Sequence, residues 1–336
     1  MNDKDNGIIS KYGFDVIKTG RCKGAVLLDT KQGYYLLKEF NGTVKHLEFE
    51  ENLLNRISEF EEIHVDRIVR DLEGNLINED DGGKRFVVRK WYNASDLDAK
   101  NDKQILAAAS GLAKLHSIMN KISYGNIYLN EYFNLNQLGE LLETEFEKHN
   151  KELKRARNFI RSKRRKNEFE LMVLKDFERF MQDAQYVNEM IDEMEIRQFI
   201  RETVERGRLI HGTYNYHNVM LSGDECIITN FERAKCSVQI RDLYDFMRKV
   251  MEKHSWDKKL GQRVMEEYNK IRSISEQELK YLALKLRYPE KYWKILNHYY
   301  NNNKAWVPDK DVFKLKQVVA QYDIRLDFIN SLLNLN

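Results

Sequence analysis

The stretch that decides the fold is LIHGTYNYHNVMLSGDECIITNFERA, residues 209–234. A short apolar strand runs into His211, a polar loop follows as far as Asn218, and two strand-like segments then flank a turn at Ser222–Glu225. Serine, glycine and aspartate in that turn are typical of a tight connection between strands. Binding and catalytic side chains concentrate on loops that a rigid scaffold holds in place. We therefore expect this hairpin and its loop to form the functional site.

Helical patterns flank the hairpin on both sides. Apolar residues recur at helical spacing from Asp102, through a long region at about 135–206, and again from Arg241 to the C-terminus. The N-terminal part differs, because its apolar segments are short and end at turns. It predicts a hairpin, one helix and two further strands, in this order: Gly24–Asp29 with Tyr34–Phe40, Thr43–Ile57, Ile63–Val69 and Phe86–Trp91.

This order of elements predicts an α+β protein with two lobes. A small β-rich lobe is expected over residues 1–92 and a larger helical lobe over residues 93–336, with the hairpin at 209–231 inside the helical lobe. Only 2 prolines and 16 glycines are present, so no linker rich in these residues divides the chain. Of the 336 residues, 42% are apolar and 32% are charged, a globular composition that is neither that of a disordered chain nor that of a membrane protein.

The net charge, the cysteines and the N-terminal sequence indicate which partners and which compartment to expect. The net charge of +3 is near balance and does not indicate nucleic-acid binding. The three cysteines, Cys22, Cys226 and Cys236, lack metal-site spacing and are expected to be reduced thiols of a cytosolic protein. The N-terminal MNDKDNGIIS is too polar for a signal peptide. No stretch reaches the roughly 18 apolar residues of a membrane helix, so we expect synthesis in the cytoplasm and no membrane span.

The hairpin resembles the catalytic hairpin of the aminoglycoside and choline phosphotransferases, which are relatives of protein kinases. In that superfamily the loop reads His-Gly-Asp, four residues and Asn, whereas here it reads His211-Gly212-Thr213, four residues and Asn218. The metal-binding strand of the superfamily reads Ile-Asp-Phe/Trp-Glu or similar, and here it reads Thr229-Asn230-Phe231-Glu232. The resemblance implies a bilobal protein-kinase-like fold.

The resemblance also implies that two catalytic aspartates are replaced in this chain. The first orients and deprotonates the accepting hydroxyl, and the second holds magnesium against the nucleotide phosphates. Thr213 stands at the first position, and a threonine hydroxyl cannot act as a base near neutral pH. Asn230 stands at the second and offers a carbonyl oxygen without charge. Asn218 and Asn230 remain as candidate metal ligands, and Glu232 could add a carboxylate close by.

Two residues of the small lobe are candidates for holding a nucleotide. Lys38 ends an apolar strand face, from which it can reach phosphate oxygens in a cleft. Glu50 lies beside the apolar stripe of the next helix, where it could pair with Lys38 and hold it. The simpler interpretations are an edge-strand lysine in water and a solvated acidic helix. The segment Ile17–Gly24 has two glycines but no GxGxxG, so ATP and magnesium are expected to bind weakly or not at all.

Two further residues have a predicted role next to the loop. Asp242 begins the helix RDLYDFMRKV, and the resemblance implies that it accepts hydrogen bonds from the backbone of the catalytic loop. The alternative is a carboxylate that only the helix dipole favours. His217 is a candidate replacement base, since a histidine titrates in the right range. The simpler interpretation, a hydrogen-bonded loop histidine, is favoured.

Four segments carry a narrower resemblance, to the CotS family of spore coat proteins. They are RSKRRKNEFELMVL (161–174), HGTYNYHNVML with ITNFERA (211–221 and 228–234), QIRDLYDFMRKVMEKHSWD (239–257) and YPEKYWKILNHYYNNNKAW (288–306). This resemblance implies residence in the protein coat that the mother cell assembles around a developing spore, with other coat proteins as partners. It favours a pseudokinase that acts as a coat component or scaffold.

Other interpretations stay open at this point. One alternative is an atypical ATP-dependent phosphotransferase that acts on a small hydroxylated molecule or a coat protein. Another is a structural module whose cleft is filled by Leu36 and by residues 89–92. The basic run from Lys151 to Lys166 is best explained as the exposed face of a long helix. Its functional alternative is a docking surface for acidic coat proteins or an anionic substrate, with nucleic acid less favoured.

Overall fold

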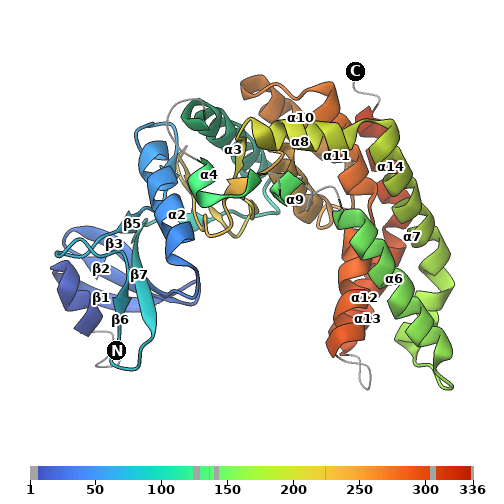
Figure 1. Cartoon of the computed structure of the whole chain (residues 1–336), viewed down its shortest axis with the longest axis horizontal. Coiled ribbons are helices and arrows are strands. Elements are labelled where there is room, and N and C mark those ends of the chain that lie inside the picture. The colour runs from blue at the N-terminus through green and yellow to red at the C-terminus, as the bar shows by residue number, and fades with distance from the viewer. Residues whose placement is uncertain are drawn as a thin grey trace. The chain divides into compact units, whose positions relative to one another are not determined.

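The computed structural model describes residues 7–123, 129–135, 137–139, 144–223, 225–302 and 308–333 (Figure 1). Contacts within the chain divide it into two compact units. The first unit is made of Met1–Tyr132 and His211–Lys235, and the second of Phe133–Ile210 and Cys236–Asn336. The boundaries of these units differ from those of the predicted lobes, 1–92 and 93–336. The predicted lobe boundary stays a prediction.

Parts of four predicted segments lie outside the described residues. They are Met1–Asn6 of the N-terminus, residues 136 and 140–143 of the long helical region, Asp224 of the hairpin turn, and residues 303–307 of the aromatic segment.

The first unit contains an antiparallel sheet of six strands. Its order is β1 (Val16–Cys22), β2 (Ala25–Thr30), β3 (Gly33–Glu39), β7 (Arg85–Trp91) and β5 (Ile68–Val69), with β6 (Asn78–Glu79) also paired to β7. The predicted hairpin is β2 with β3, and β7 is the strand predicted at Phe86–Trp91. The α+β class predicted from the sequence is confirmed, because this sheet is followed by helices throughout the second unit.

Strand β1 has no counterpart in the sequence prediction. Its seven residues are exposed or half-exposed throughout, so no alternation of apolar and polar side chains marks it. The two-residue turn Lys23-Gly24 joins it to β2. Both turn residues have positive φ angles, +48° and +79°, as a type I′ turn requires. The segment Ile17–Gly24 therefore contains most of β1 and the turn of a hairpin between β1 and β2.

Helix α2 (Val44–Ile57) matches the helix predicted at Thr43–Ile57. The Thr43 hydroxyl accepts a hydrogen bond from the backbone N–H of His46 and so caps the helix. The face that α2 buries is apolar except for one carboxylate, and its members are Leu47, Phe49, Glu50, Leu53, Leu54 and Ile57. Because Glu50 lies on this face, its charge needs a partner inside the unit.

A second, small sheet in the first unit contains the predicted catalytic-type hairpin. Its order is β4 (His64–Val65), β11 (Glu225–Ile228), β10 (Val219–Ser222) and β8 (Ser95–Asp96). The antiparallel pairing of β10 with β11 confirms the hairpin. Strand β4 runs parallel to β11, with Val65 opposite Ile228. The residues that follow these two strands, Asp66 and Thr229, therefore end up side by side.

Two helices complete the described part of the first unit. They are α3 (Asp102–Ser123) and α4 (Leu129–Tyr132), and a 3₁₀ turn at Ser10–Tyr12 precedes β1. Helix α3 contacts the hairpin, since the Tyr214 hydroxyl donates to the Ala108 carbonyl at 2.7 Å. A side chain at Gly111 would place its Cβ 2.6 Å from the Cys226 sulfur, so glycine is needed for this close approach.

The second unit is almost entirely helical. Its helices are α6 (Glu145–Ser162), α7 (Glu168–Glu193), α8 (Ile196–Glu205), α9 (Ile240–Met251), α10 (Lys258–Ile271), α11 (Glu276–Arg287), α12 (Glu290–Asn302), α13 (Asp309–Ala320) and α14 (Tyr322–Leu333). Short strands β9 (Leu209–Ile210) and β12 (Lys235–Cys236) lie where the chain passes from one unit to the other. In the described ranges, the helices are all too short or too polar to cross a membrane.

Candidate functional site

His211 anchors the catalytic-type loop from inside the first unit. Its ring is fully buried, and Nε2 lies 3.0 Å from the Thr229 carbonyl oxygen. The backbone N–H of Thr213 donates to Nδ1 at 3.2 Å. Gly212 between them has a φ of +81°, and an added Cβ would lie 2.1 Å from the Arg233 carbonyl oxygen. The His-Gly pair therefore fixes the path of the chain into the loop.

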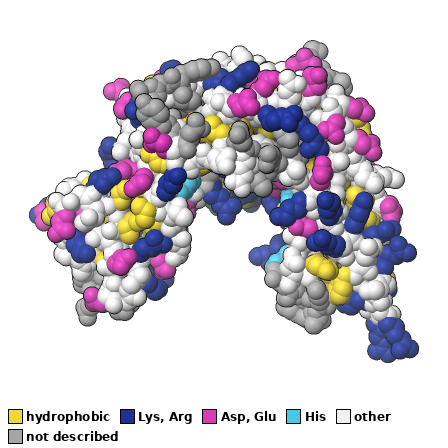
Figure 2. All heavy atoms as spheres, viewed as in Figure 1, with side chains coloured by type: hydrophobic (Ala, Val, Ile, Leu, Met, Phe, Trp, Pro, Cys, Tyr) yellow, Lys and Arg dark blue, Asp and Glu magenta, His cyan; other side chains and the backbone are white. Residues whose placement is uncertain are grey.

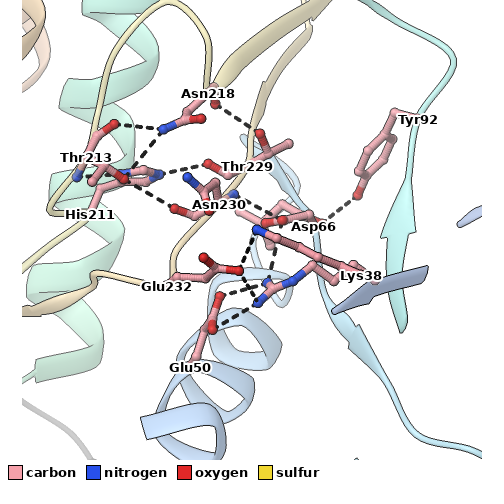
Figure 3. Close-up of polar contacts among 12 residues, drawn as sticks. Lys38, Glu50, Asp66, Tyr92, His211, Thr213, Asn218, Thr229, Asn230 and Glu232 are labelled. Atoms are coloured by element: carbon pink, nitrogen blue, oxygen red, sulfur yellow. Dashed lines mark hydrogen bonds and ion pairs between the residues drawn. The ribbon is translucent and has the colours of Figure 1, made fainter. Parts of the chain in front are cut away.

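The structure brings together the three residues that the hairpin motif singles out (Figure 3). The Asn218 side-chain amide donates to the Thr213 carbonyl oxygen at 2.9 Å. The Thr213 hydroxyl donates to the backbone carbonyl of Asn230 at 3.4 Å. Thr213, Asn218 and Asn230 thus lie around one point, as the motif predicts, while their roles in chemistry stay predictions.

Asn230 and Asp66 form a pair that the sequence did not predict. The backbone N–H of Asn230, whose φ is +70°, donates to Oδ2 of Asp66 at 3.0 Å. Oδ1 of Asn230 and Oδ1 of Asp66 are both buried and have no hydrogen-bond partner among the described residues. Burial raises the pKa of Asp66 to about 7, although Arg89 opposes the rise. The sequence predicted one strand over Ile63–Val69, but the structure has two, β4 (His64–Val65) and β5 (Ile68–Val69), in different sheets, and Asp66 lies between them.

Lys38 pairs with Glu232 and not with Glu50. Its Nζ lies 2.6 Å from Oε1 of Glu232, whose side chain extends from the loop after β11. Burial alone would raise the pKa of Glu232, but its hydrogen bond and charge interaction with Lys38, aided by Arg89, hold that pKa below its usual range. The predicted pair of Lys38 with Glu50 is therefore wrong, and Glu232 supplies the carboxylate.

Arg89 of β7 is the partner of Glu50. Its Nη1 and Nη2 lie 2.7 Å and 3.1 Å from the two carboxylate oxygens, and the side chains are only 2% and 1% exposed. Arg89 lies opposite Leu36 in the sheet and Lys38 opposite Val87, so both cations are on the same sheet face. The planar guanidinium matches a carboxylate in two bonds at once, which an ammonium cannot do. This explains why Arg89 holds Glu50 in place of Lys38.

Arg89 also joins the other carboxylates into one network. Its Nη1 lies 3.6 Å from Oδ2 of Asp66, and its Nη2 lies 3.8 Å from Oε1 of Glu232. Two cations, Lys38 and Arg89, thus face three acidic groups. The cations are neutralised by the protein itself.

A cavity of about 290 Å³ opens beside this network. Twelve residues line it: Lys23, Ala25, Leu36, Lys38, Asp66, Arg89, Trp91, Asp96, His217, Asn218, Thr229 and Asn230. Leu36 and Trp91 belong to a buried apolar cluster with Ala25, Met220 and Ile227. These large side chains form one wall of the cavity and do not fill it. The predicted alternative, a cleft filled by Leu36 and residues 89–92, is therefore wrong for Leu36 and Trp91.

Lys23 closes one side of the cavity. From the β1–β2 turn, its Nζ donates to the His217 carbonyl oxygen at 2.6 Å and lies 2.8 Å from Oδ1 of Asp96. The His217 side chain is exposed, and its predicted role as a base stays a prediction. Lys23 was not predicted as a site residue, because a lysine in a turn has no pattern that separates it from other surface lysines.

The residues fit a magnesium ion only in part. Among the described residues, no group of three or more His, Cys, Asp and Glu side chains could hold a metal. The carboxylates of Asp66 and Asp96 and the amide side chains of Asn218 and Asn230 line the same cavity, and Asp96 is paired with Lys23. Magnesium uses oxygen ligands, commonly one or two carboxylates together with water and phosphate. The buried Oδ1 of Asn230, which has no partner, is consistent with such a ligand.

Asp242 lies in the second unit, in the first turn of α9, and is fully buried. Its backbone N–H donates to the Gln239 carbonyl oxygen at 3.0 Å. Its predicted support of the catalytic-type loop stays a prediction, as do the predicted contacts of Lys38 and Glu50 with a nucleotide.

Comparison with known proteins identifies the fold and the family. A family model described as "Spore coat putative kinase YutH" matches residues 5–332. An aminoglycoside phosphotransferase from Alicyclobacillus acidocaldarius has a similar structure, with a TM-score of 0.85 and 16% sequence identity over 98% of this chain and 95% of that one. No match to a curated protein sequence was found. The predicted spore coat family of kinase-like fold is confirmed.

More distant structures share the fold. Spectinomycin phosphotransferase APH(9)-Ia bound to AMP has a TM-score of 0.63 and 12% identity over 98% of this chain and 97% of that one. Amicoumacin kinase hAmiN in complex with AMP-PNP and Ca²⁺ has a TM-score of 0.59 and 13% identity over 96% and 94%. These likenesses establish the aminoglycoside phosphotransferase-like fold.

Proposed function

Because this chain belongs to the YutH family of kinase-like spore coat proteins, we propose that it is a pseudokinase that acts as a coat component or scaffold. It is made in the cytoplasm of the mother cell and ends in the spore coat, where other coat proteins are its partners. The single observation that carries this proposal is Thr213, which stands where the fold normally has its catalytic base.

The surroundings of Thr213 support the proposal. Its hydroxyl already donates to the Asn230 carbonyl oxygen, and a threonine hydroxyl does not accept a proton near neutral pH. Among the described residues that line the cavity, the carboxylates are Asp66 and Asp96. Asp66 accepts from the Asn230 backbone, and Asp96 is paired with Lys23. Neither carboxylate follows the His211-Gly212 pair, where this fold has its base.

The ion pair of Lys38 also supports the pseudokinase proposal. In this fold a lysine holds nucleotide phosphates, but here Glu232 occupies the ammonium at 2.6 Å. A phosphate would have to displace that carboxylate or lie beside its negative charge. ATP, if it binds, is therefore bound weakly.

One observation favours the second candidate, an atypical phosphotransferase. Asp66 brings a carboxylate to the cavity beside Asn230, although the motif has lost its own. Asp66, Asn218 and Asn230 would hold the magnesium ion, and the ion would supply positive charge against nucleotide phosphates. Such a site would still lack a base, so we rank this candidate second.

Phosphate transfer from ATP by the purified chain, with magnesium or manganese, tests the proposal. We expect no transfer above background from the wild type. The variant Thr213→Asp/Asn230→Asp, which restores both lost carboxylates, is expected to gain transfer, and the further change Lys38→Ala is expected to remove it. Transfer by the wild type that Lys38→Ala abolishes would overturn the pseudokinase proposal in favour of the second candidate.

A further inference from the structure

Helix α6 in the second unit has two opposite faces. Phe146, Leu153, Ala156 and Ile160 are buried and lie on one side of the helix. At 100° per residue, the opposite side presents a row of exposed cations. They are Lys148, Lys151, Lys154 and Arg155, and Arg161, Arg164 and Arg165 continue the exposed charge into the turn before α7. The predicted exposed basic face is confirmed for Lys151, Lys154, Arg155 and Arg161, whereas residues 163–166 of the basic run lie beyond the end of α6.

These seven cations have no ionic partner among the described residues, whereas their neighbours do. Arg157 is paired with Glu178, and Lys163 is paired with Glu170. Lys166 donates to the Lys163 carbonyl oxygen. Figure 2 shows the resulting concentration of Lys and Arg at the lower right, around the end of α6. The second unit otherwise pairs many of its charges, so this row stands out as unneutralised.

A groove runs along the cationic row between α6 and α7. Its volume is about 370 Å³, and it is lined by Glu147, Asn150, Lys151, Lys154, Met181, Gln185, Asn188 and Glu189. Lys151 and Lys154 belong both to the groove and to the row. The groove therefore has positive charge on the side of the row.

We propose that this groove binds an extended acidic segment of a partner polypeptide. The carboxylates of the segment lie against Lys151, Lys154 and Arg155. This proposal rests on the proposed function as a coat component or scaffold that binds other coat proteins. It adds the binding surface and the chemistry of the partner.

The groove fits a polypeptide better than a nucleic acid. Glu147 and Glu189 also line the groove, and they would repel a polyanion with closely spaced charges. A peptide with spaced carboxylates can avoid them.

Fluorescence anisotropy of a labelled peptide that alternates glutamate and glycine tests the proposal on the full chain. The comparison ligands are the same peptide with glutamine in place of glutamate, and single-stranded DNA. The surface variant is Lys151→Glu/Lys154→Glu/Arg155→Glu. The control variant, Lys45→Glu/Lys100→Glu/Lys103→Glu, reverses the same number of charges at exposed lysines of the first unit that have no ion pair there. Circular dichroism checks that both variants are folded.

We expect the surface variant to weaken acidic-peptide binding by about tenfold or more, and the control by less than about twofold. Raised salt is expected to weaken acidic-peptide binding. Three outcomes would each overturn the proposal: no binding of the acidic peptide, an equal loss in both charge variants, or DNA binding as tight as acidic-peptide binding. No nucleotide enters this test, so its failure is separate from a failure of the pseudokinase proposal.

Discussion

Nζ of Lys38 lies 2.6 Å from Oε1 of Glu232, and this ion pair joins strand β3 to the loop that follows β11. The two residues are far apart in the chain but belong to the same compact unit. The pair places a carboxylate of the protein on the ammonium that this fold normally turns toward phosphate. Glu232 therefore acts as an internal competitor for any anionic ligand of Lys38.

The change Glu232→Gln is expected to raise the affinity of the chain for ATP. Removing the charge leaves the Lys38 ammonium free for a phosphate oxygen, with a gain of several-fold in binding. Isothermal titration calorimetry with ATP measures it, and Glu39→Gln, at the exposed pair with Lys84, is the matched control. Unchanged or weaker binding in Glu232→Gln would show that Glu232 does not compete for Lys38.

The change Glu50→Gln is expected to lower the free energy of unfolding by about 3 kcal/mol or more, because it leaves the Arg89 charge buried and poorly compensated. Urea denaturation measures the loss. Glu51→Gln is the control on the same helix: its partner Arg70 is 49% exposed, and such pairs contribute about 0–1 kcal/mol. Equal losses in the two variants would contradict a special role for the buried pair.

The change Gly212→Ala is expected to destabilise the protein more than Gly24→Ala does. Both glycines have similar positive φ angles, +81° and +79°, so both substitutions strain the backbone. Only at position 212 would the new Cβ meet another atom, the Arg233 carbonyl oxygen at 2.1 Å, whereas nothing lies within 4 Å at Gly24. Thermal unfolding of the two variants measures the difference, and similar melting temperatures would argue against the clash.

Glu145 is expected to make the second unit sensitive to acid. Burial alone would raise the pKa of its carboxyl group, but Lys285 and Arg241 lower it to about 2. Since the folded pKa is below the ordinary value of 4.5, the stabilisation is fully present above that value and is lost as pH falls toward 2. The whole contribution is about 3 kcal/mol.

Unfolding free energies of the wild type and Glu145→Gln, measured between neutral pH and pH 2, test this dependence. The difference between the two proteins is expected to shrink as pH falls through this window. Glu276→Gln, at a carboxylate on the protein surface, serves as the control. A constant difference at all pH values would mean that the ionised form of Glu145 gives no stabilisation.

Much of the first unit could be predicted because its signals are local. The β10–β11 hairpin follows from apolar segments around a turn, and α2 follows from its apolar stripe and the capping Thr43. Thr213, Asn218 and Asn230 could be placed together because a short motif holds all three. Strand β1 escaped prediction since an exposed edge strand carries no alternating pattern.

The ion pairs could not be predicted, because they depend on which strands become neighbours. Arg89 reaches Glu50 only because β7 pairs with β3 in a register that sets Arg89 opposite Leu36. Asp66 meets Asn230 only because β4 runs parallel to β11. Neither contact can be inferred from spacing along the chain. The sequence therefore suggested Lys38, the lysine of the preceding strand, as the partner of Glu50.

The pairing of β4 with β11 has a consequence for the order of folding. Residues 211–235 of the first unit are translated only after residues 133–210 of the second. The edge of β4 that receives β11 therefore stays unpaired while the ribosome makes α6, α7 and α8. Partly folded chains that expose apolar surface and unpaired strand edges are prone to aggregate. A product that ends before residue 211 would keep that edge permanently, and we expect it to aggregate where the full-length chain does not.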